Sequence, residues 1–141
     1  MDISRYATLI FDCDGVVLDS NKVKTVAFYN AALPYGVTAA EALMEYHKKH
    51  GGISRYVKFE YFLKKIVKTR TEQTKLDILL DDYAHQVRKG LLCCQISHGL
   101  KKLRQVTQSR WLVVSGGDQN ELRDIFSQRN LAESFNGGIF G

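Results

Sequence analysis

The stretch LIFDCDGVVLDS, residues 9–20, decides the fold of this chain. It completes the short apolar run YATLIF (6–11) and passes at once into turn residues, a pattern that predicts a buried β-strand. The strand ends on two carboxylates one residue apart, Asp12 and Asp14. Because side chains alternate along an extended segment, both could face one crevice with Cys13 turned away. Two such close charges repel, so the arrangement is favourable when a divalent cation lies between them or when one acid holds a proton.

A second strand is predicted at WLVVS (111–115), followed by Gly116-Gly117. The spacing of Asp118 and Glu121 is that of a capping box, which predicts a helix to about Arg129. Glycines let a backbone approach an anion closely, and the N–H groups at a helix start bind phosphate. Ser115 adds a hydroxyl donor, so the turn predicts a phosphate site. A third strand is expected near 138–141.

The segment from 21 to about 95 is predicted to be helical throughout. Pro34 and Gly36 end a first helix, Thr38 with Glu41 has capping-box spacing for a second, and Gly51-Gly52 ends that one. Further helices are expected over 54–67, 74–92 and 99–106. The residues expected to face inward in the first, third and fourth of these helices are Val23, Val26, Ala27, Ala31, Tyr56, Phe59, Leu63, Ile66, Val67, Leu76, Leu79, Leu80, Tyr83 and Val87.

Strands separated by helices predict an α/β fold with a parallel sheet. We expect a Rossmann-like core formed by residues 1–19 and 96–141, with an inserted helical domain over 20–95. Ligands bind beyond the carboxyl ends of parallel strands, which is where Asp12 and Ser115 lie. The sequence therefore predicts that the two residues share one anion site.

Composition restricts the class of protein. The 141 residues are 45% apolar, no apolar run approaches the ~20 residues of a membrane span, and the N-terminus lacks a signal-peptide pattern. Three cysteines, Cys13, Cys93 and Cys94, fit a reducing compartment and are interpreted as small buried apolar residues. We expect a cytoplasmic protein without a membrane partner.

The net charge of +5 is concentrated between residues 21 and 70, where ten Lys or Arg face three acids. Such a basic block binds nucleic acid or an anionic small substrate, or is only a solvated helix face. For most individual lysines the solvated face is the commoner case.

LIFDCDGVVLDS resembles the first motif of the haloacid dehalogenase superfamily, and WLVVSGGDQNEL resembles its second. The helical insert resembles the C1-type cap of the β-phosphoglucomutase-like and phosphoglycolate-phosphatase-like branch, and HGGISRYVKFEYFL (50–63) resembles a segment of that cap. The resemblance implies a Mg²⁺-dependent phosphohydrolase acting on a small phosphorylated metabolite. Asp12 would be the nucleophile and Asp14 the acid and base. The Asp12 carboxylate and the Asp14 carbonyl would bind Mg²⁺, and Ser115 with the Gly116 amide would hold the phosphoryl group.

The resemblance also places Arg55, and by helical spacing Lys58, where related enzymes touch the distal part of the substrate, although a solvated lysine is the commoner role for Lys58. Lys24 stands where β-phosphoglucomutases tend to carry a histidine, which favours a phosphatase over a mutase. The family's later motifs, a lysine and one or two acids, have no counterpart before Gly141. We therefore expect the 141-residue chain alone to be inactive or weakly active. We also expect it either to self-associate through the edge of the first strand or to be marginally stable and aggregation-prone.

Two alternatives stay open. One is a phosphomutase of the β-phosphoglucomutase type. The other is a non-catalytic, truncated binding module that uses the basic helical block. Nucleic acid is the less favoured partner, because the Asp12–Asp14 pair repels phosphates unless a metal is bound.

Overall fold

The computed structural model describes residues 2–141, which divide into two compact units. The first unit contains the described residues up to Asn21 together with Leu91–Gly141. The second unit contains Lys22–Gly90 and is helical. Each unit has its own hydrophobic core. No helix in the described part of the chain is long and apolar enough to cross a membrane.

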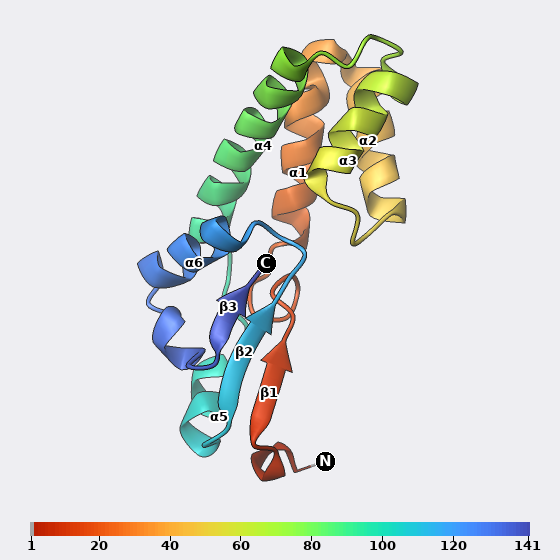
Figure 1. Ribbon diagram of the computed structural model, residues 1–141. Helices are drawn as coiled ribbons and strands as arrows, with labels where there is room; N and C mark the ends of the chain where they lie inside the picture. Colours follow the sequence, from red (N-terminus) through yellow and green to blue (C-terminus); the bar gives the residue numbers. More distant parts are fainter. Residues whose placement is uncertain (1) are drawn as a thin grey trace. The chain divides into compact units, whose positions relative to one another are not determined.

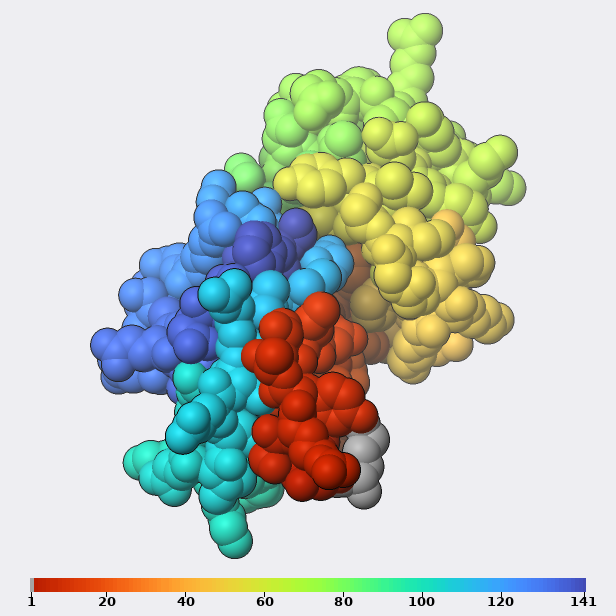
Figure 2. Space-filling view, turned by 60° about the horizontal axis from the view of Figure 1, so that its bottom comes forward, coloured from red at the N-terminus to blue at the C-terminus, as the bar shows by residue number. Residues whose placement is uncertain are grey.

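The first unit contains a parallel sheet of three strands in the order β1-β2-β3, with β1 at Thr8–Phe11, β2 at Arg110–Val114 and β3 at Gly138–Phe140. The register pairs Leu9 with Trp111 and Val113 with Ile139. Figure 1 shows the three strands side by side. In Figure 2 the red segment, which contains β1, lies against the cyan segment, which contains β2. The predicted parallel α/β core and its three strands are therefore confirmed.

One face of the sheet is buried in an aromatic core. The ring of Trp111 lies 4.6 Å from Phe11 and 5.7 Å from Phe135, measured between centroids, and Phe135 lies 5.4 Å from Phe126. Phe126 belongs to α6 (Gln119–Gln128), so these contacts pack that helix against the sheet. The Trp111 indole N–H donates to the Thr107 hydroxyl at 3.2 Å, which satisfies its buried polar atom. The unit also contains α5 (Leu100–Val106) and the 3₁₀ turns η1 (Ile3–Arg5) and η4 (Ala132–Ser134).

The opposite face of the sheet carries exposed apolar side chains. Ile10 keeps 68% of its surface accessible, Val114 49% and Phe140 40%. Side chains alternate between the two faces of a strand, so one apolar face of the sheet is open within the described chain.

The second unit consists of helices only, as predicted, and no strand occurs among described residues 22–90. The elements are α1 (Asn21–Ala32), η2 (Leu33–Tyr35), α2 (Val37–Lys49), α3 (Arg55–Tyr61), the π-helical turn η3 (Phe62–Ile66) and α4 (Gln73–Cys93). Fully buried side chains at its centre are Phe28, Leu43, Phe59, Phe62, Leu63, Leu79 and Val87. The last three residues of α4 belong to the first unit.

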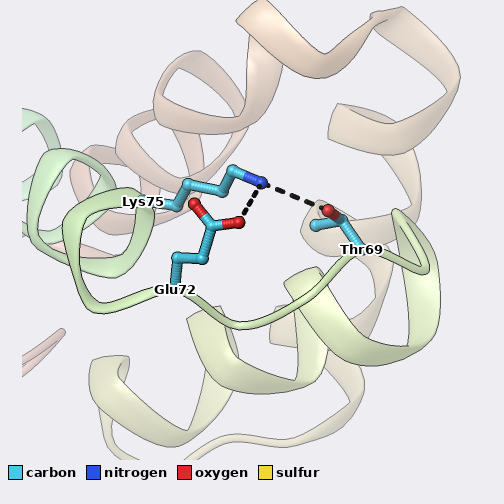
Figure 3. Close-up of polar contacts among 3 residues, drawn as sticks. All are labelled: Thr69, Glu72 and Lys75. Atoms are coloured by element: carbon cyan, nitrogen blue, oxygen red, sulfur yellow. Dashed lines mark hydrogen bonds and ion pairs between the residues drawn. The ribbon is translucent and has the colours of Figure 1, made fainter.

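The link between η3 and α4 is held by one lysine. Lys75 Nζ donates to the Thr69 hydroxyl at 3.3 Å and lies 3.4 Å from a Glu72 carboxylate oxygen (Figure 3). Because Lys75 lies in the first turn of α4, these contacts fix the start of the helix to the chain that precedes it.

Several local predictions are wrong. Thr38 does not cap α2, which begins at Val37 after Gly36, a residue with φ of +105° and no capping side chain. Val26 and Tyr56, expected to face inward, are exposed by 54% and 52%. The buried face of α1 instead comprises Ala27, Phe28, Ala31 and Ala32. Of the cysteines, only Cys13 is buried, and Cys93 is exposed.

Candidate functional site

The candidate site lies where two neighbouring parallel strands end. Asp12 directly follows β1 and Ser115 directly follows β2. The register pairs Phe11 with Val113, which places Asp12 level with Val114 and Ser115 one residue beyond. Adjacent strands lie about 4.8 Å apart, so both residues stand at the same edge of the sheet.

The Asp12 carboxylate is at the surface, whereas the side chain of the next residue, Cys13, is buried in the core. Asp12 is exposed, and its Oδ1 accepts a 2.6 Å hydrogen bond from the backbone N–H of Cys13. Cys13 is 0% exposed. The alternation expected from the sequence therefore holds at this point, and it leaves the first carboxylate open to a ligand.

The Asp14 carboxylate is half-buried and held by a serine. Its Oδ1 accepts a 2.5 Å hydrogen bond from the hydroxyl of Ser20, which is itself 0% exposed. Sequence reasoning missed Ser20, although this residue ends the deciding stretch. A small hydroxyl residue six positions after Asp14 was the available signal.

The loop between these residues folds back on itself. The Cys13 carbonyl accepts from the N–H groups of both Val17 and Leu18 at 3.0 Å, and Gly15 N–H donates to the Leu18 carbonyl at 2.8 Å. Gly15 has φ of +71°, a conformation that side-chain-bearing residues rarely adopt. Val17 and Leu18 are fully buried and anchor the loop, so the Asp12–Asp14 pair stands on a fixed backbone.

The second half of the site is the turn that leads into α6. Ser115 is half-buried, and its Oγ accepts from Gly117 N–H at 3.2 Å. Asp118 caps the helix as predicted, accepting from the N–H groups of Asn120 and Glu121 at 3.1 Å. Gly116 is exposed, and a Cβ placed there would meet no atom within 4 Å. The turn therefore offers an open backbone N–H and a hydroxyl to an anion.

The residues present fit part of a magnesium site. The Asp12 carboxylate and the Asp14 carbonyl are oxygen donors of the kind that Mg²⁺ prefers. Among the described residues no group of three His, Cys, Asp or Glu side chains is arranged to hold a metal ion.

The other two predicted site residues, Arg55 and Lys58, belong to the helical unit. The Arg55 guanidinium lies 4.8 Å from the centre of the Tyr83 ring. Lys58 is only 3% exposed, so it is not a solvated lysine, and its Nζ lies 2.9 Å from Nδ1 of His47. Burial, and secondarily the charge of Lys24, lowers the pKa of Lys58 below its ordinary value. Sequence reasoning did not place His47 beside Lys58.

Comparison with known proteins identifies the family. The profile of the haloacid dehalogenase-like hydrolases matches residues 9–139, nearly the whole chain. This chain belongs to the haloacid dehalogenase-like hydrolase family. The match begins at the first residue of LIFDCDGVVLDS and includes both strand ends of the candidate site. Among curated proteins, none matches the sequence significantly.

Solved structures share the fold at low sequence identity. A "putative beta-phosphoglucomutase" from Thermotoga maritima is 14% identical with a TM-score of 0.65, and a "putative phosphatase" from Clostridium difficile is 17% identical with a TM-score of 0.63. A "putative HAD-hydrolase" from Bacillus subtilis, bound to magnesium, is 19% identical with a TM-score of 0.61. Each alignment covers 96% of this chain but only 62%, 60% and 64% of the respective structure. The chain thus spans less than two thirds of these proteins.

Proposed function

We propose that this chain carries the nucleophile and phosphate-binding part of a Mg²⁺-dependent phosphohydrolase that acts on a small phosphorylated metabolite. One observation carries the proposal: the exposed Asp12 carboxylate and the Ser115-Gly116 turn follow two paired parallel strands and stand at one edge of the sheet. A nucleophile beside an anion-binding turn is the arrangement that phosphoryl transfer requires.

In the first step the Asp12 carboxylate attacks the phosphorus atom, and an aspartyl-phosphate forms as the bond to the leaving oxygen breaks. Asp14, in its protonated form, gives its proton to that leaving oxygen. In the second step Asp14 takes a proton from water, the water oxygen attacks phosphorus, and inorganic phosphate leaves with Asp12 restored. Magnesium, bound by the Asp12 carboxylate and the Asp14 carbonyl, would neutralise phosphoryl charge.

Two further contacts suit these roles. Ser20 donates to Oδ1 of Asp14 and so orients the carboxyl group for the proton exchange proposed here. Ser115 Oγ accepts from Gly117 N–H, so its own hydroxyl proton is directed elsewhere and can reach a phosphoryl oxygen. The Gly116 N–H adds a second donor. Arg55 and Lys58 are proposed to recognise an anionic group in the distal part of the substrate.

A phosphomutase is the second candidate, favoured by the fold shared with the Thermotoga maritima structure. It would convert one sugar phosphate into an isomer instead of releasing phosphate.

A binding module that uses the basic helical block is the third candidate function, and it would bind nucleic acid in a salt-dependent way. We further propose that the isolated 141-residue chain has low turnover and self-associates through β1.

The test uses beryllium fluoride, which mimics a phosphoryl group on an aspartate and requires no turnover. With Mg²⁺ present, ¹⁹F NMR should show a bound adduct on the parent chain and none on Asp12→Asn. Asp81→Asn, the same chemical change at an exposed position of α4, should retain it. An adduct that persists on Asp12→Asn, or one that is lost from Asp81→Asn as well, would contradict the nucleophile assignment.

A further inference from the structure

Three aromatic rings of the helical unit, His50, Tyr46 and Tyr61, form what we call the ring column. Tyr46 and Tyr61 lie almost parallel, with their centroids 3.9 Å apart and an angle of 9° between the two planes. His50 stacks on Tyr46 at 4.2 Å and 27°. Two rings cannot occupy one face of a phenol at these distances, so His50 and Tyr61 cover opposite faces of Tyr46.

The imidazole of His50 is held in place at one end of this column. Its Nδ1 lies 2.9 Å from the carbonyl oxygen of Tyr46, one helical turn earlier. A carbonyl oxygen only accepts, so Nδ1 carries the proton of this hydrogen bond. The bond and the stack together fix the position and the plane of the imidazole, so a ligand that stacks on it loses little affinity to side-chain ordering.

The outer face of the imidazole is open. His50 is exposed and directly follows α2, and no second aromatic ring lies against it among described residues 2–141. The next two residues are Gly51 and Gly52, where an added Cβ would meet no atom within 4 Å. The chain that continues from His50 therefore carries no side chain that could cover the ring.

A flat, exposed and immobile ring is more than the end of a helix requires. The hydrogen bond to the Tyr46 carbonyl would satisfy the last turn of α2 without any stack. Elsewhere in the same unit, Phe59 meets Tyr83 at 79° and Tyr35 meets Phe62 at 89°, which are edge-to-face contacts. The ring column is instead a flat stack, and flat stacking is how aromatic side chains bind nucleobases.

We propose that the open face of His50 binds the nucleobase of a nucleoside, which continues the ring column. Every base has a flat π surface, and stacking requires no charge on the ligand. Phenyl rings of protein side chains prefer edge-to-face or offset contacts, so the flat imidazole face favours a base over an aromatic side chain of a peptide. The inference concerns the helical unit alone. It depends neither on aspartyl-phosphate chemistry nor on an anion site at Arg55 and Lys58.

Histidine proton resonances test this proposal, with adenosine as the probe and with ribose and N-acetyltyrosinamide as references. Adenosine should move the ring-proton signals of His50 upfield, because the ring current of the stacked base acts on them, and the shift should saturate. The signals of His85, an exposed histidine of α4, should stay unchanged. Ribose should produce no shift of His50, and N-acetyltyrosinamide a much smaller one at the same concentration.

Three variants decide the outcome, with binding measured from the base-proton signals of adenosine. His50→Ala should weaken binding by about fivefold or more, the loss expected for one stacking contact. His85→Ala, the same change at an exposed position of α4, should bind like the parent. His50→Phe keeps a flat ring and should bind more tightly than His50→Ala, which separates stacking from the loss of the Nδ1 hydrogen bond.

The proposal is overturned if adenosine leaves the His50 signals in place or if either reference compound acts like adenosine. It is also overturned if His50→Ala binds adenosine as well as His85→Ala does, or if His50→Phe binds no better than His50→Ala.

Discussion

The buried hydroxyl of Ser20 donates a 2.5 Å hydrogen bond to Oδ1 of Asp14. The two residues close the loop that follows β1, and the same hydroxyl lies 3.3 Å from the Leu18 carbonyl. The bond holds the Asp14 carboxylate in one orientation, as the proposed proton exchange with a substrate would require.

Replacing Ser20 with Ala should lower the free energy of unfolding by about 1–2 kcal/mol, because the half-buried Asp14 loses a charge-assisted bond. Urea denaturation measures the change. Ser127→Ala, at an exposed position of α6, is the matched control and should be nearly neutral. Equal effects of the two substitutions would show that the Ser20–Asp14 bond contributes nothing to stability.

Gly15→Ala should destabilise the loop by about 1–2 kcal/mol because a side chain is strained at φ of +71°. The added Cβ would also lie 2.6 Å from Nδ2 of Asn21, whose side chain would have to move. Thermal unfolding should show a lower midpoint for this variant. Gly51→Ala, where a Cβ meets no atom within 4 Å, should leave the midpoint almost unchanged.

Gly90 lies in α4 against Val23 of α1, and a Cβ there would lie 2.3 Å from a Val23 methyl carbon. Gly90→Ala should therefore destabilise the helical unit by about 1–3 kcal/mol, although alanine is the better helix former. The double variant Gly90→Ala/Val23→Ala should recover most of the loss. A double-mutant cycle of unfolding free energies measures this coupling, and strictly additive effects would rule out the proposed overlap.

Lys58 should make stability depend on pH. Its pKa in the folded state is lowered below the ordinary 10.5, first by burial and then by Lys24. Between the folded and unfolded pKa values the unfolded chain binds more protons, so the unfolding free energy rises with pH through that window. Below the window the protein carries the full cost of the buried charge.

Lys58→Met removes this dependence, so its stability advantage over the parent should be largest near neutral pH and shrink as the pH approaches 10.5. Urea denaturation at several pH values measures the difference. Lys65→Met should parallel the parent at each pH. A parent and a Lys58→Met curve that stay parallel would contradict the shift.

Structural features that depend on residues close together in the sequence could be predicted from the sequence. Asp118 caps α6 because its acceptor oxygen and the N–H groups it serves are two and three residues apart. The strand before Asp12 could be predicted for the same reason, because the apolar run and the turn residues that follow it are adjacent in the sequence. Thr38 is not the cap because Gly36, which also ends the turn that contains Pro34, is the N-cap of α2, two residues earlier.

Structural features that depend on contacts between residues far apart in the sequence could not be predicted. Lys58 was expected in solvent, but His47, eleven residues away on another helix, and Phe28 of a third helix enclose its side chain. Val26 was expected inside because of its spacing, yet the packed face of α1 is centred on Phe28, which contacts both Phe59 and Tyr83. At the candidate site, the strand ends were predictable and the Ser20 support of Asp14 was not.

Ile10 keeps 68% of its surface in water, whereas Trp111 on the adjoining strand keeps none. A side chain that is already hydrated changes its surroundings little when the chain unfolds. Within the described residues, the face of β1 that carries Thr8 and Ile10 should therefore accept substitutions, whereas substitutions at Leu9 and Phe11 on the other face should destabilise the fold. Natural variants of this chain should accumulate polar substitutions at every second position of one short strand, while the positions between them keep their size and apolar character.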